Sequence, residues 1–197
     1  MTKIEQLELL KTEVLSCKKC KLHETRTKVV FGEGNPDGGV LLIGEGPGAD
    51  EDKTGRPFVG RSGQLLDKIL DAAGFNRKDH VFIANIVKCR PPNNREPEKD
   101  EREACLPYLH KQIEIIDPKI IVLLGATALK LIDPSMRLKD AKGQWMIWKD
   151  KIVLTTYHPS ALLRNPNLKK ESWDHFKKLF YKYREIINPE IKSEHIK

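Results

Sequence analysis

The sequence predicts an α/β fold, a three-layer α/β/α sandwich around a central parallel sheet. Short apolar runs rich in β-branched residues alternate along the chain with longer amphipathic stretches, the pattern of parallel strands buried between covering helices. The 197 residues, 39% of them hydrophobic, can fill one core. We therefore expect residues 1–197 to form a single domain.

Four apolar runs predict the strands of this sheet. Each run is too short for a helix and is flanked by residues typical of turns. The four runs are residues 40–43, 81–84, 120–124 and 152–155. Because ligands of open α/β sheets bind beyond the carboxyl ends of the strands, we expect the functional site there.

Amphipathic stretches between and around these runs predict the helices. Pro97 is expected to open one helix and Gly74 to end another. The predicted helices span residues 4–15, 62–73, 98–116, 126–132 and 168–187. We expect the last residues, 193–197, to be frayed.

Charge and hydropathy indicate which partners and which compartment to expect for this protein. The net charge of +7 and the pI of about 9.2 are compatible with nucleic-acid binding, although lysine-rich surfaces also occur in proteins that bind none. Met1 leads directly into a charged helical pattern, and no later segment has the roughly 18 apolar residues of a membrane span. We expect a cytoplasmic protein with no membrane association.

The four cysteines predict one metal site. Cys17 and Cys20 are separated by two lysines, a spacing that lets two thiolates reach the same centre, and Cys89 and Cys105 supply two more from distant segments. Four thiolates suit either zinc or an iron–sulfur cluster. In a reducing compartment this use is favoured over disulfides. The alternative is a set of unpaired, buried cysteines.

A glycine-rich segment, residues 44–52, follows the first predicted strand. It satisfies the G-x-G-x-x-A dinucleotide pattern, but its three acidic residues at positions 50–52 would face a pyrophosphate, and the second strand lacks the ribose-binding acid. We therefore exclude a dinucleotide site. The glycines instead allow a flat ring to approach the backbone closely; the alternative is a tight turn before an acidic helix start.

The second predicted strand ends in Asn85, whose amide offers a donor and an acceptor side by side. This pattern pairs with an amide edge such as that of a pyrimidine, although a lone Asn is more often a turn former. The proline-rich loop that follows is expected to hold Arg90 and Arg95 near phosphates.

The fourth predicted strand ends in His158, which could donate to a developing anion, although a His before Pro is more often structural. Leu162 and Leu163 could wedge into a base stack, with Arg164 beside them on a phosphate.

Together these features resemble the family 4 uracil-DNA glycosylases, the iron–sulfur type of bacteria and archaea. The resemblance extends from Cys17 to about Arg164 and depends on the order and combination of its motifs. These motifs are the segment of residues 44–52, Phe58, the strand ending in Asn85, the His158-Pro159-Ser160 sequence and the four cysteines.

The resemblance implies the uracil-DNA glycosylase fold, with four parallel strands in the order 2-1-3-4. It also implies a structural 4Fe-4S cluster, bound in part by the N-terminal segment, with the ligands Cys17, Cys20, Cys89 and Cys105. The implied activity is hydrolysis of the N-glycosidic bond of uracil in single- and double-stranded DNA, which leaves an abasic site for base excision repair. We expect the protein to act as a monomer.

The resemblance also assigns roles to single residues. Phe58 would stack on the flipped uracil, Asn85 would bind its O4 and N3 edge, and His158 would hydrogen-bond O2. Leu162 or its neighbour would fill the vacated stack. The backbone of Gly44 and Gly46 would line the base pocket.

The chain departs from the commonest uracil-DNA glycosylases at two positions of the glycine-rich segment. Gly46 replaces an Asp that orients water, and Gly48 replaces a Tyr that excludes the thymine methyl group. We expect Glu45 to form the pocket wall and to exclude thymine, and Glu51 to orient the water or stabilise the sugar cation.

Two other functions are compatible with parts of the sequence. One is that of a uracil-binding relative of the same fold, which forms a lasting covalent adduct with DNA. That function depends on a basic, histidine-containing insertion, and no such insertion follows Pro92 in this chain. The other is a zinc-stabilised nucleotide-binding module without catalysis.

Overall fold

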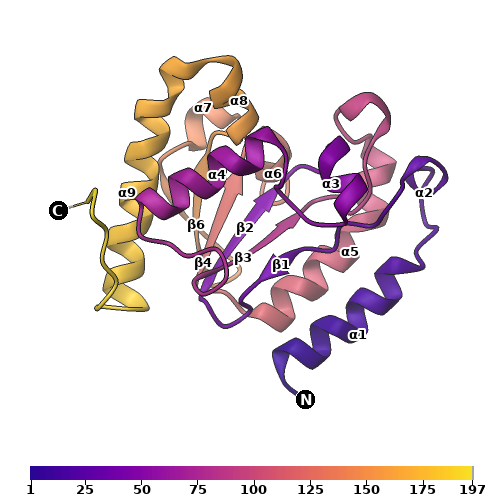
Figure 1. The fold of residues 1–197 in the computed structure, drawn as a ribbon, viewed down its shortest axis with the longest axis horizontal. Helices are drawn as coiled ribbons and strands as arrows, with labels where there is room; N and C mark the ends of the chain where they lie inside the picture. The colour runs from indigo at the N-terminus through magenta and orange to yellow at the C-terminus, as the bar shows by residue number, and fades with distance from the viewer. Residues whose placement is uncertain (197) are drawn as a thin grey trace.

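A computed structural model describes residues 1–196 and shows a mixed sheet between two layers of helices (Figure 1). The sheet has six strands in the order β1-β3-β2-β4-β6-β5. Their bounds are Glu33–Gly34 (β1), Val40–Gly44 (β2), Val81–Asn85 (β3), Ile120–Leu124 (β4), Trp145–Trp148 (β5) and Lys151–Thr156 (β6).

The four predicted strands form the parallel centre of this sheet. The spatial order β3-β2-β4-β6 is the expected order 2-1-3-4. Every residue of β2, β3 and β4 is buried, as their uninterrupted apolar sequences require. The fold class predicted from the sequence is therefore confirmed.

Two antiparallel edge strands were not predicted. β1 contributes only two residues, and β5 pairs with β6 through a hairpin whose turn residues, Lys149 and Asp150, have φ values of 45° and 64°. Such a turn usually contains glycine or asparagine, so its sequence gives a weak signal. Ile147 on β5 is 73% exposed, which also departs from the pattern of a buried strand.

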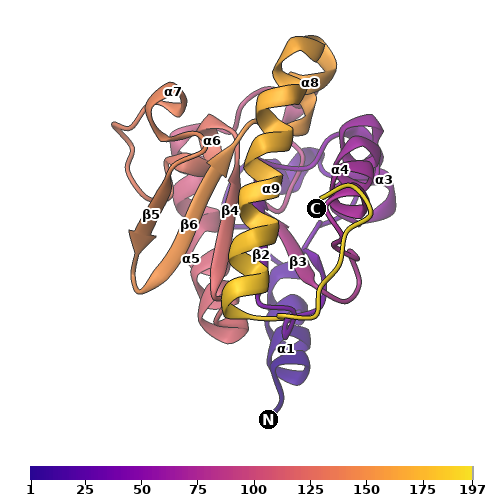
Figure 2. The same cartoon turned by 90° about the vertical axis from the view of Figure 1, so that its left-hand side faces the viewer.

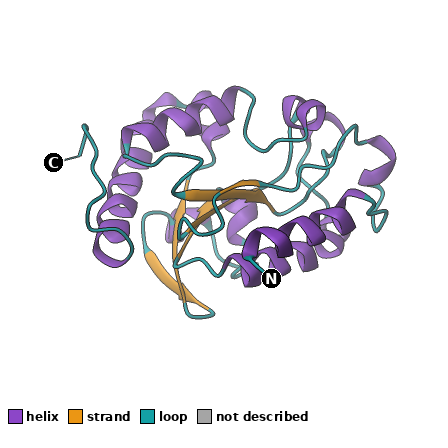
Figure 3. Cartoon of the chain, turned by 60° about the horizontal axis from the view of Figure 1, so that its bottom comes forward, coloured by secondary structure: helices purple, strands orange, loops and turns teal. Residues whose placement is uncertain are grey.

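Helices cover both faces of the sheet (Figure 2). The longer ones are α1 (Lys3–Leu15), α4 (Arg61–Ala72), α5 (Lys99–Ile116) and α9 (Lys169–Ile186). The side chains of β2 alternate: Leu41 and Ile43 pack in the same core as α1 and α5, whereas Val40 and Leu42 pack with α4 and α9. Figure 3 shows the strands between these helical layers.

Shorter helices connect the elements around the carboxyl ends of the strands. They are α2 (Leu22–Thr25), α3 (Ala49–Thr54), α6 (Ala126–Leu129), α7 (Leu138–Ala141) and α8 (Pro159–Arg164), with 3-10 turns at Pro92–Asn94 and Pro166–Leu168. Of these, the sequence predicted α6 alone, and the helix is shorter than the expected 126–132. In the part of the chain that the structure describes, no helix is long and apolar enough to cross a membrane.

The expected fraying of the C-terminal residues is wrong for residues 193–196. The Ser193 hydroxyl donates a 2.8 Å hydrogen bond to the carbonyl of Ala72, and Ile196 is 7% exposed in the core beside α4 and α9. The final residue of the predicted segment, Lys197, lies outside the described residues.

Candidate functional site

A cleft of about 580 Å³ lies at the carboxyl ends of the parallel strands. Register places Gly44, the last residue of β2, directly beside Asn85, the last residue of β3. The predicted site residues that line the cleft are Glu45, Gly46, Glu51, Phe58, Asn85, Arg95, His158 and Arg164. The topology thus brings together residues that are more than a hundred positions apart in the sequence.

Asn85 presents an unsatisfied acceptor at the base of this cleft. Asn85 is only 2% exposed, and its Oδ1 is buried without a hydrogen-bond partner among the described residues. A buried polar atom of this kind is costly unless a ligand or water pairs with it. The amide oxygen is therefore a ready acceptor for an N–H group of a bound molecule.

Phe58 lies beside Asn85 and His158. Its ring centroid is 5.5 Å from that of His158, with a tilt of 33° between the two rings. A Cβ atom on Gly44 would approach the Phe58 ring to 2.6 Å and Asn85 Oδ1 to 2.5 Å. Gly44 thus has no room for a side chain, and it shapes the cleft through these two neighbours although it is not itself among the lining residues.

His158 is the N-cap residue of α8 and has a defined tautomer. The backbone N–H of Ser160 donates to His158 Nδ1 at 3.1 Å, so Nδ1 is an acceptor. The proton of the neutral ring is then on Nε2, which can donate to a group in the cleft. Burial, with a smaller effect of Arg164, lowers the pKa of His158 to about 4 against an opposing effect of Glu51. The ring is therefore neutral near pH 7.

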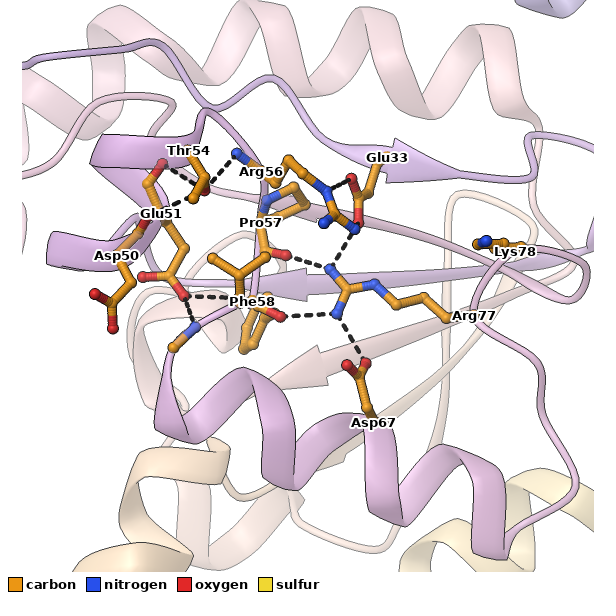
Figure 4. A network of polar contacts seen from close by, with 12 residues as sticks. Glu33, Asp50, Glu51, Thr54, Arg56, Pro57, Phe58, Asp67, Arg77 and Lys78 are labelled. Atoms are coloured by element: carbon orange, nitrogen blue, oxygen red, sulfur yellow. Dashed lines mark hydrogen bonds and ion pairs between the residues drawn. The ribbon is translucent and has the colours of Figure 1, made fainter.

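Glu51 is held by backbone N–H groups from two segments. Its Oε1 accepts from Val59 and Gly60, both at 2.8 Å (Figure 4). Its Oε2 accepts from Gly48 at 3.1 Å. The carboxylate therefore fixes the loop that carries Phe58. Whether it also orients water stays a prediction.

Glu45 follows β2 and contacts a residue that was not predicted to belong to the site. Its Oε2 accepts a 2.6 Å hydrogen bond from the hydroxyl of Thr127, at the start of α6. Thr127 and Glu96 both line the cleft. The signal for Thr127 was available, because it lies just beyond the third predicted strand and its Gly125 turn.

The two glycines that distinguish this chain from common uracil-DNA glycosylases lie in confined places. A Cβ on Gly46 would be 2.7 Å from Val87 Cγ2, and a Cβ on Gly48 would be 2.9 Å from Glu51 Oε2. Side chains at these positions would displace a core residue or the Glu51 carboxylate.

The three arginines expected to contact DNA differ in their surroundings. Arg164 lies at the cleft with an exposed side chain, whereas Arg95 is paired with the fully buried Glu101 through two hydrogen bonds of 2.8 and 2.7 Å. Arg90 is not among the residues that line the cleft, and its Nε donates to Asn94 Oδ1 at 2.7 Å.

The structure places the two leucines expected to contact DNA in different environments. Leu162 is 1% exposed because it faces inward from α8, whereas its neighbour Leu163 is 37% exposed. Of this pair, Leu163 is the side chain exposed to solvent.

The four cysteines line one small cavity. Cys17 and Cys20 approach it from the segment after α1, Cys89 from the loop after β3, and Cys105 from α5. Within residues 1–196, no group of three or more His, Cys, Asp or Glu side chains is gathered closely enough to hold a single metal ion. The four thiols thus line one cavity, but they do not converge closely enough to ligate a single ion.

The surroundings of this cavity suit an anionic centre. Arg26 donates to Cys89 Sγ at 3.3 Å, and the backbone N–H of Lys88 donates to Cys105 Sγ at 3.3 Å. The Lys88 side chain is buried, its Nζ donates to the carbonyl of Asn85 and to Gln112, and no carboxylate of the described residues pairs with it. A buried cation without an anionic partner is unfavourable, so an adjacent negative group would stabilise it.

The thiols would release protons on binding such a centre. Burial raises the pKa of Cys20 and of Cys89, and it raises the pKa of Cys105 to about 11. These three thiols are therefore protonated at neutral pH, and thiolate ligation would displace their protons.

Comparisons with known proteins agree with the fold. The model of the Uracil DNA glycosylase superfamily matches residues 31–182. A type-4 uracil-DNA glycosylase of Sulfurisphaera tokodaii is 50% identical over 185 residues, which cover 89% of this chain and 84% of that protein. One of Thermotoga maritima is 50% identical over 167 residues, covering 83% and 86%. The chain therefore belongs to the type-4 uracil-DNA glycosylases, which confirms the resemblance found in its sequence.

More distant members of the superfamily match a shorter part of the chain. A type-5 uracil-DNA glycosylase of Thermus thermophilus is 32% identical over 117 residues, which cover 52% of this chain and 53% of that protein. The longer and stronger matches thus favour the type-4 group over the type-5 group.

Proposed function

We propose that the chain removes uracil from DNA by hydrolysing its N-glycosidic bond and that the cleft beyond β2, β3 and β6 binds the flipped base. The observation that carries this proposal is the unpartnered Oδ1 of buried Asn85, which lies in one cleft with Phe58 and His158. Uracil has an N3–H donor for this acceptor and a flat face for the aromatic ring. Membership in the type-4 group supports the same substrate.

The polarity of the cleft selects uracil over cytosine. Asn85 Oδ1 accepts from N3–H of uracil, and its Nδ2 donates to O4. Cytosine presents an unprotonated N3 and an amino group at these positions, so both contacts would be reversed. A buried mismatch of this kind is typically worth about 1–3 kcal/mol per unsatisfied group.

His158 acts as the bond breaks. The electron pair of the C1′–N1 bond moves onto the uracil ring, and the sugar becomes positive. The Nε2–H of neutral His158 donates to O2, where part of the negative charge collects, and this hydrogen bond strengthens in the transition state. Water then adds to C1′, and the proton that it loses balances the charge of the departing uracil anion.

The water partner in this scheme is Glu45. Glu51 has both oxygens engaged by backbone N–H groups, which leaves it to hold the Phe58 loop and to contribute negative charge near the cationic sugar. Glu45 uses Oε2 for Thr127, and its Oε1 accepts no hydrogen bond from the described residues. The free oxygen of Glu45 is thus available to orient water from the wall of the cleft.

Excision of uracil tests this proposal directly. A labelled oligonucleotide with one uracil is incubated with the protein and then treated with alkali, which cuts the strand only at an abasic site. We expect cutting of single strands and of duplexes with U·G or U·A, and none of matched oligonucleotides that contain thymine or cytosine. A purified protein that leaves every uracil substrate intact would overturn the proposal.

We also propose that Cys17, Cys20, Cys89 and Cys105 hold a 4Fe-4S cluster. A cluster carries one iron for each thiolate, which suits four cysteines placed around a cavity better than a single zinc ion with four sulfurs at about 2.3 Å. The cationic side chains of Arg26 and Lys88 support a negative centre there. Its contribution would be structural, because it would join the N-terminal segment, the loop after β3 and α5. Iron and sulfide analysis of anaerobically purified protein tests this, and stoichiometric zinc without iron would contradict it.

DNA binding would use the surface around the cleft, with the whole chain acting as one monomeric domain. Arg164 and Leu163 at α8 are exposed beside the opening. We propose that Leu163 enters the base stack when uracil leaves it and that Arg164 contacts a flanking phosphate.

A further inference from the structure

Phe58 is in a backbone conformation that a bulky residue rarely adopts. Its φ is 49°, in the left-handed region, although it is not a glycine. Such a conformation persists only where surrounding contacts hold it. A Cβ on Gly63 would be 2.0 Å from the Phe58 carbonyl carbon, which shows how closely the first turn of α4 packs on this peptide. The position of the ring in the cleft therefore depends on what holds its backbone.

One side of this backbone is held by Arg77, which comes from the loop between α4 and β3. Its Nη1 donates to the carbonyl of Phe58 at 2.7 Å, and its Nη2 donates to the carbonyl of Pro57 (Figure 4). The two nitrogens of one planar guanidinium thus bind two consecutive carbonyl groups, an arrangement that the single ammonium of lysine does not reproduce.

Arg77 is itself held from two directions. Nη1 is 2.8 Å from Asp67 on α4, and Nη2 is 3.0 Å from Glu33 on β1. The Arg77 side chain is 15% exposed, and its Nε is buried without a partner among the described residues, so the two Nη groups make all of these contacts. The guanidinium therefore ties the Phe58 peptide to a helix and to a strand.

The opposite side of the same backbone is held by Glu51. Its Oε1 accepts from the N–H groups of Val59 and Gly60, immediately after Phe58. A cation thus binds the carbonyls of residues 57 and 58, and an anion binds the N–H groups of residues 59 and 60. The left-handed residue lies at the point where these two sets of contacts meet.

We infer that Arg77 is a positioning residue for uracil recognition: by binding the carbonyls of Pro57 and Phe58 it fixes the Phe58 ring as a preformed stacking surface for the flipped base. Arg77 does not line the cleft, and its action on the substrate is transmitted through Phe58. This inference rests on the proposed function, because it assigns the Phe58 ring to the uracil. Fixing the ring before binding removes the loss of freedom that a mobile ring would suffer.

A double-mutant cycle tests the inference. Arg77→Met keeps the apolar stem and removes the guanidinium, and Arg56→Ala is the matched control because Arg56 binds Glu33 through two 2.9 Å hydrogen bonds but neither carbonyl. Each change is made in the wild-type and in the Phe58→Ala background. The measurements are single-turnover excision at subsaturating enzyme, the Kd of free uracil and the Kd of a DNA that contains a stable abasic-site analogue.

We expect Arg77→Met to weaken uracil binding and to lower excision, each by about tenfold, within the range typical of one stacked base. Its affinity for abasic DNA should be unchanged, because no base occupies the cleft. Arg56→Ala should behave as wild type in all three measurements. In the Phe58→Ala background, Arg77→Met should add little, because the ring through which it acts is gone.

Each outcome decides a separate point. The inference would be overturned if Arg77→Met lowered uracil binding and excision equally in the Phe58→Ala background. Unchanged uracil binding by Arg77→Met alone would overturn it as well. Normal uracil binding by Phe58→Ala alone would instead remove the stacking role on which the proposed function depends. Should Arg77→Met fail to fold, Arg77→Lys enters the same cycle; it keeps the charge but pairs with fewer groups, and wild-type uracil binding by that variant would overturn the inference as well.

Discussion

Replacing His158 by alanine should slow uracil excision strongly while leaving the fold intact. The ring is fixed by the Ser160 N–H at Nδ1, and its pKa of about 4 keeps it neutral, so Nε2–H is a preorganised donor. Removing one such donor to a developing anion typically lowers the rate by about 10²–10³, or about 3–4 kcal/mol. Affinity for uracil-containing DNA should change much less, because the hydrogen bond strengthens mainly in the transition state.

The assay for His158→Ala is single-turnover excision at saturating enzyme, with DNA affinity and melting temperature measured on the same preparation. His158→Gln serves as a partner variant, because its amide can donate to O2 but cannot titrate. We expect Gln to recover part of the lost rate. A variant with a lower melting temperature and near-normal excision in its folded fraction would refute the catalytic role and leave His158 with a structural one.

The same histidine predicts how stability depends on pH. Its pKa is about 4 in the folded chain, against 6.5 for an unperturbed histidine side chain, so between these values the unfolded chain binds more protons. Stability from this group is complete above pH 6.5 and is lost progressively as the pH falls toward 4, by at most about 3 kcal/mol. His158→Gln should therefore flatten the decline of the melting temperature in this window. An identical decline in both proteins would show that burial of His158 does not control it.

Three further predictions address the base, the cysteine site and the DNA. Asn85→Asp should raise the activation barrier for uracil excision by roughly 1–3 kcal/mol, because a carboxylate cannot donate a hydrogen bond to O4. Unchanged kinetics in the same oligonucleotide assay would show that Asn85 does not bind the base. Cys105→Ala should abolish visible absorbance and lower the melting temperature, whereas an iron content equal to wild type would exclude Cys105 as a ligand. The affinity for duplex DNA should fall with salt with a log–log slope of about −0.9 per neutralised phosphate, and Arg164→Ala should reduce that slope by about one unit; a slope that is equal in the variant would show that Arg164 touches no phosphate.

The central part of the fold was predictable from the sequence because it depends on local patterns. The apolar runs of β2, β3, β4 and β6 are typical of strands buried on both faces of a parallel sheet. The carboxyl ends of parallel strands meet at one edge of the sheet. The positions of Asn85 and His158 in the cleft follow from that topology. The edge strand β5 was not predictable in the same way, because its hairpin turn contains neither glycine nor asparagine and one of its apolar residues faces solvent.

The remaining site residues could not be found from spacing because they act through long-range contacts. Arg77 binds backbone carbonyls 19 and 20 positions away, and nothing in its own segment marks it as different from a surface arginine. Glu51 was expected to orient the water or stabilise the sugar cation, and spacing gave no sign that its oxygens also accept from N–H groups of a loop that folds back onto it. Leu162 and Leu163 are chemically alike, and only the direction of α8 decides which one is buried.

The packing around the glycine-rich segment explains why positions 46 and 48 carry no acid and no tyrosine in this chain. A side chain at Gly46 would meet Val87, and one at Gly48 would meet the Glu51 carboxylate that fixes the Phe58 loop. Neither position can carry a functional group unless its neighbour moves. The wall of the cleft is therefore formed by backbone and by Glu45, whose Oε2 is held by Thr127 from the end of a different strand. In the proposed mechanism, Glu45, held by Thr127 of α6, takes the place of an acid held by its own loop, and the charged contacts on either side of Phe58 position the stacking ring.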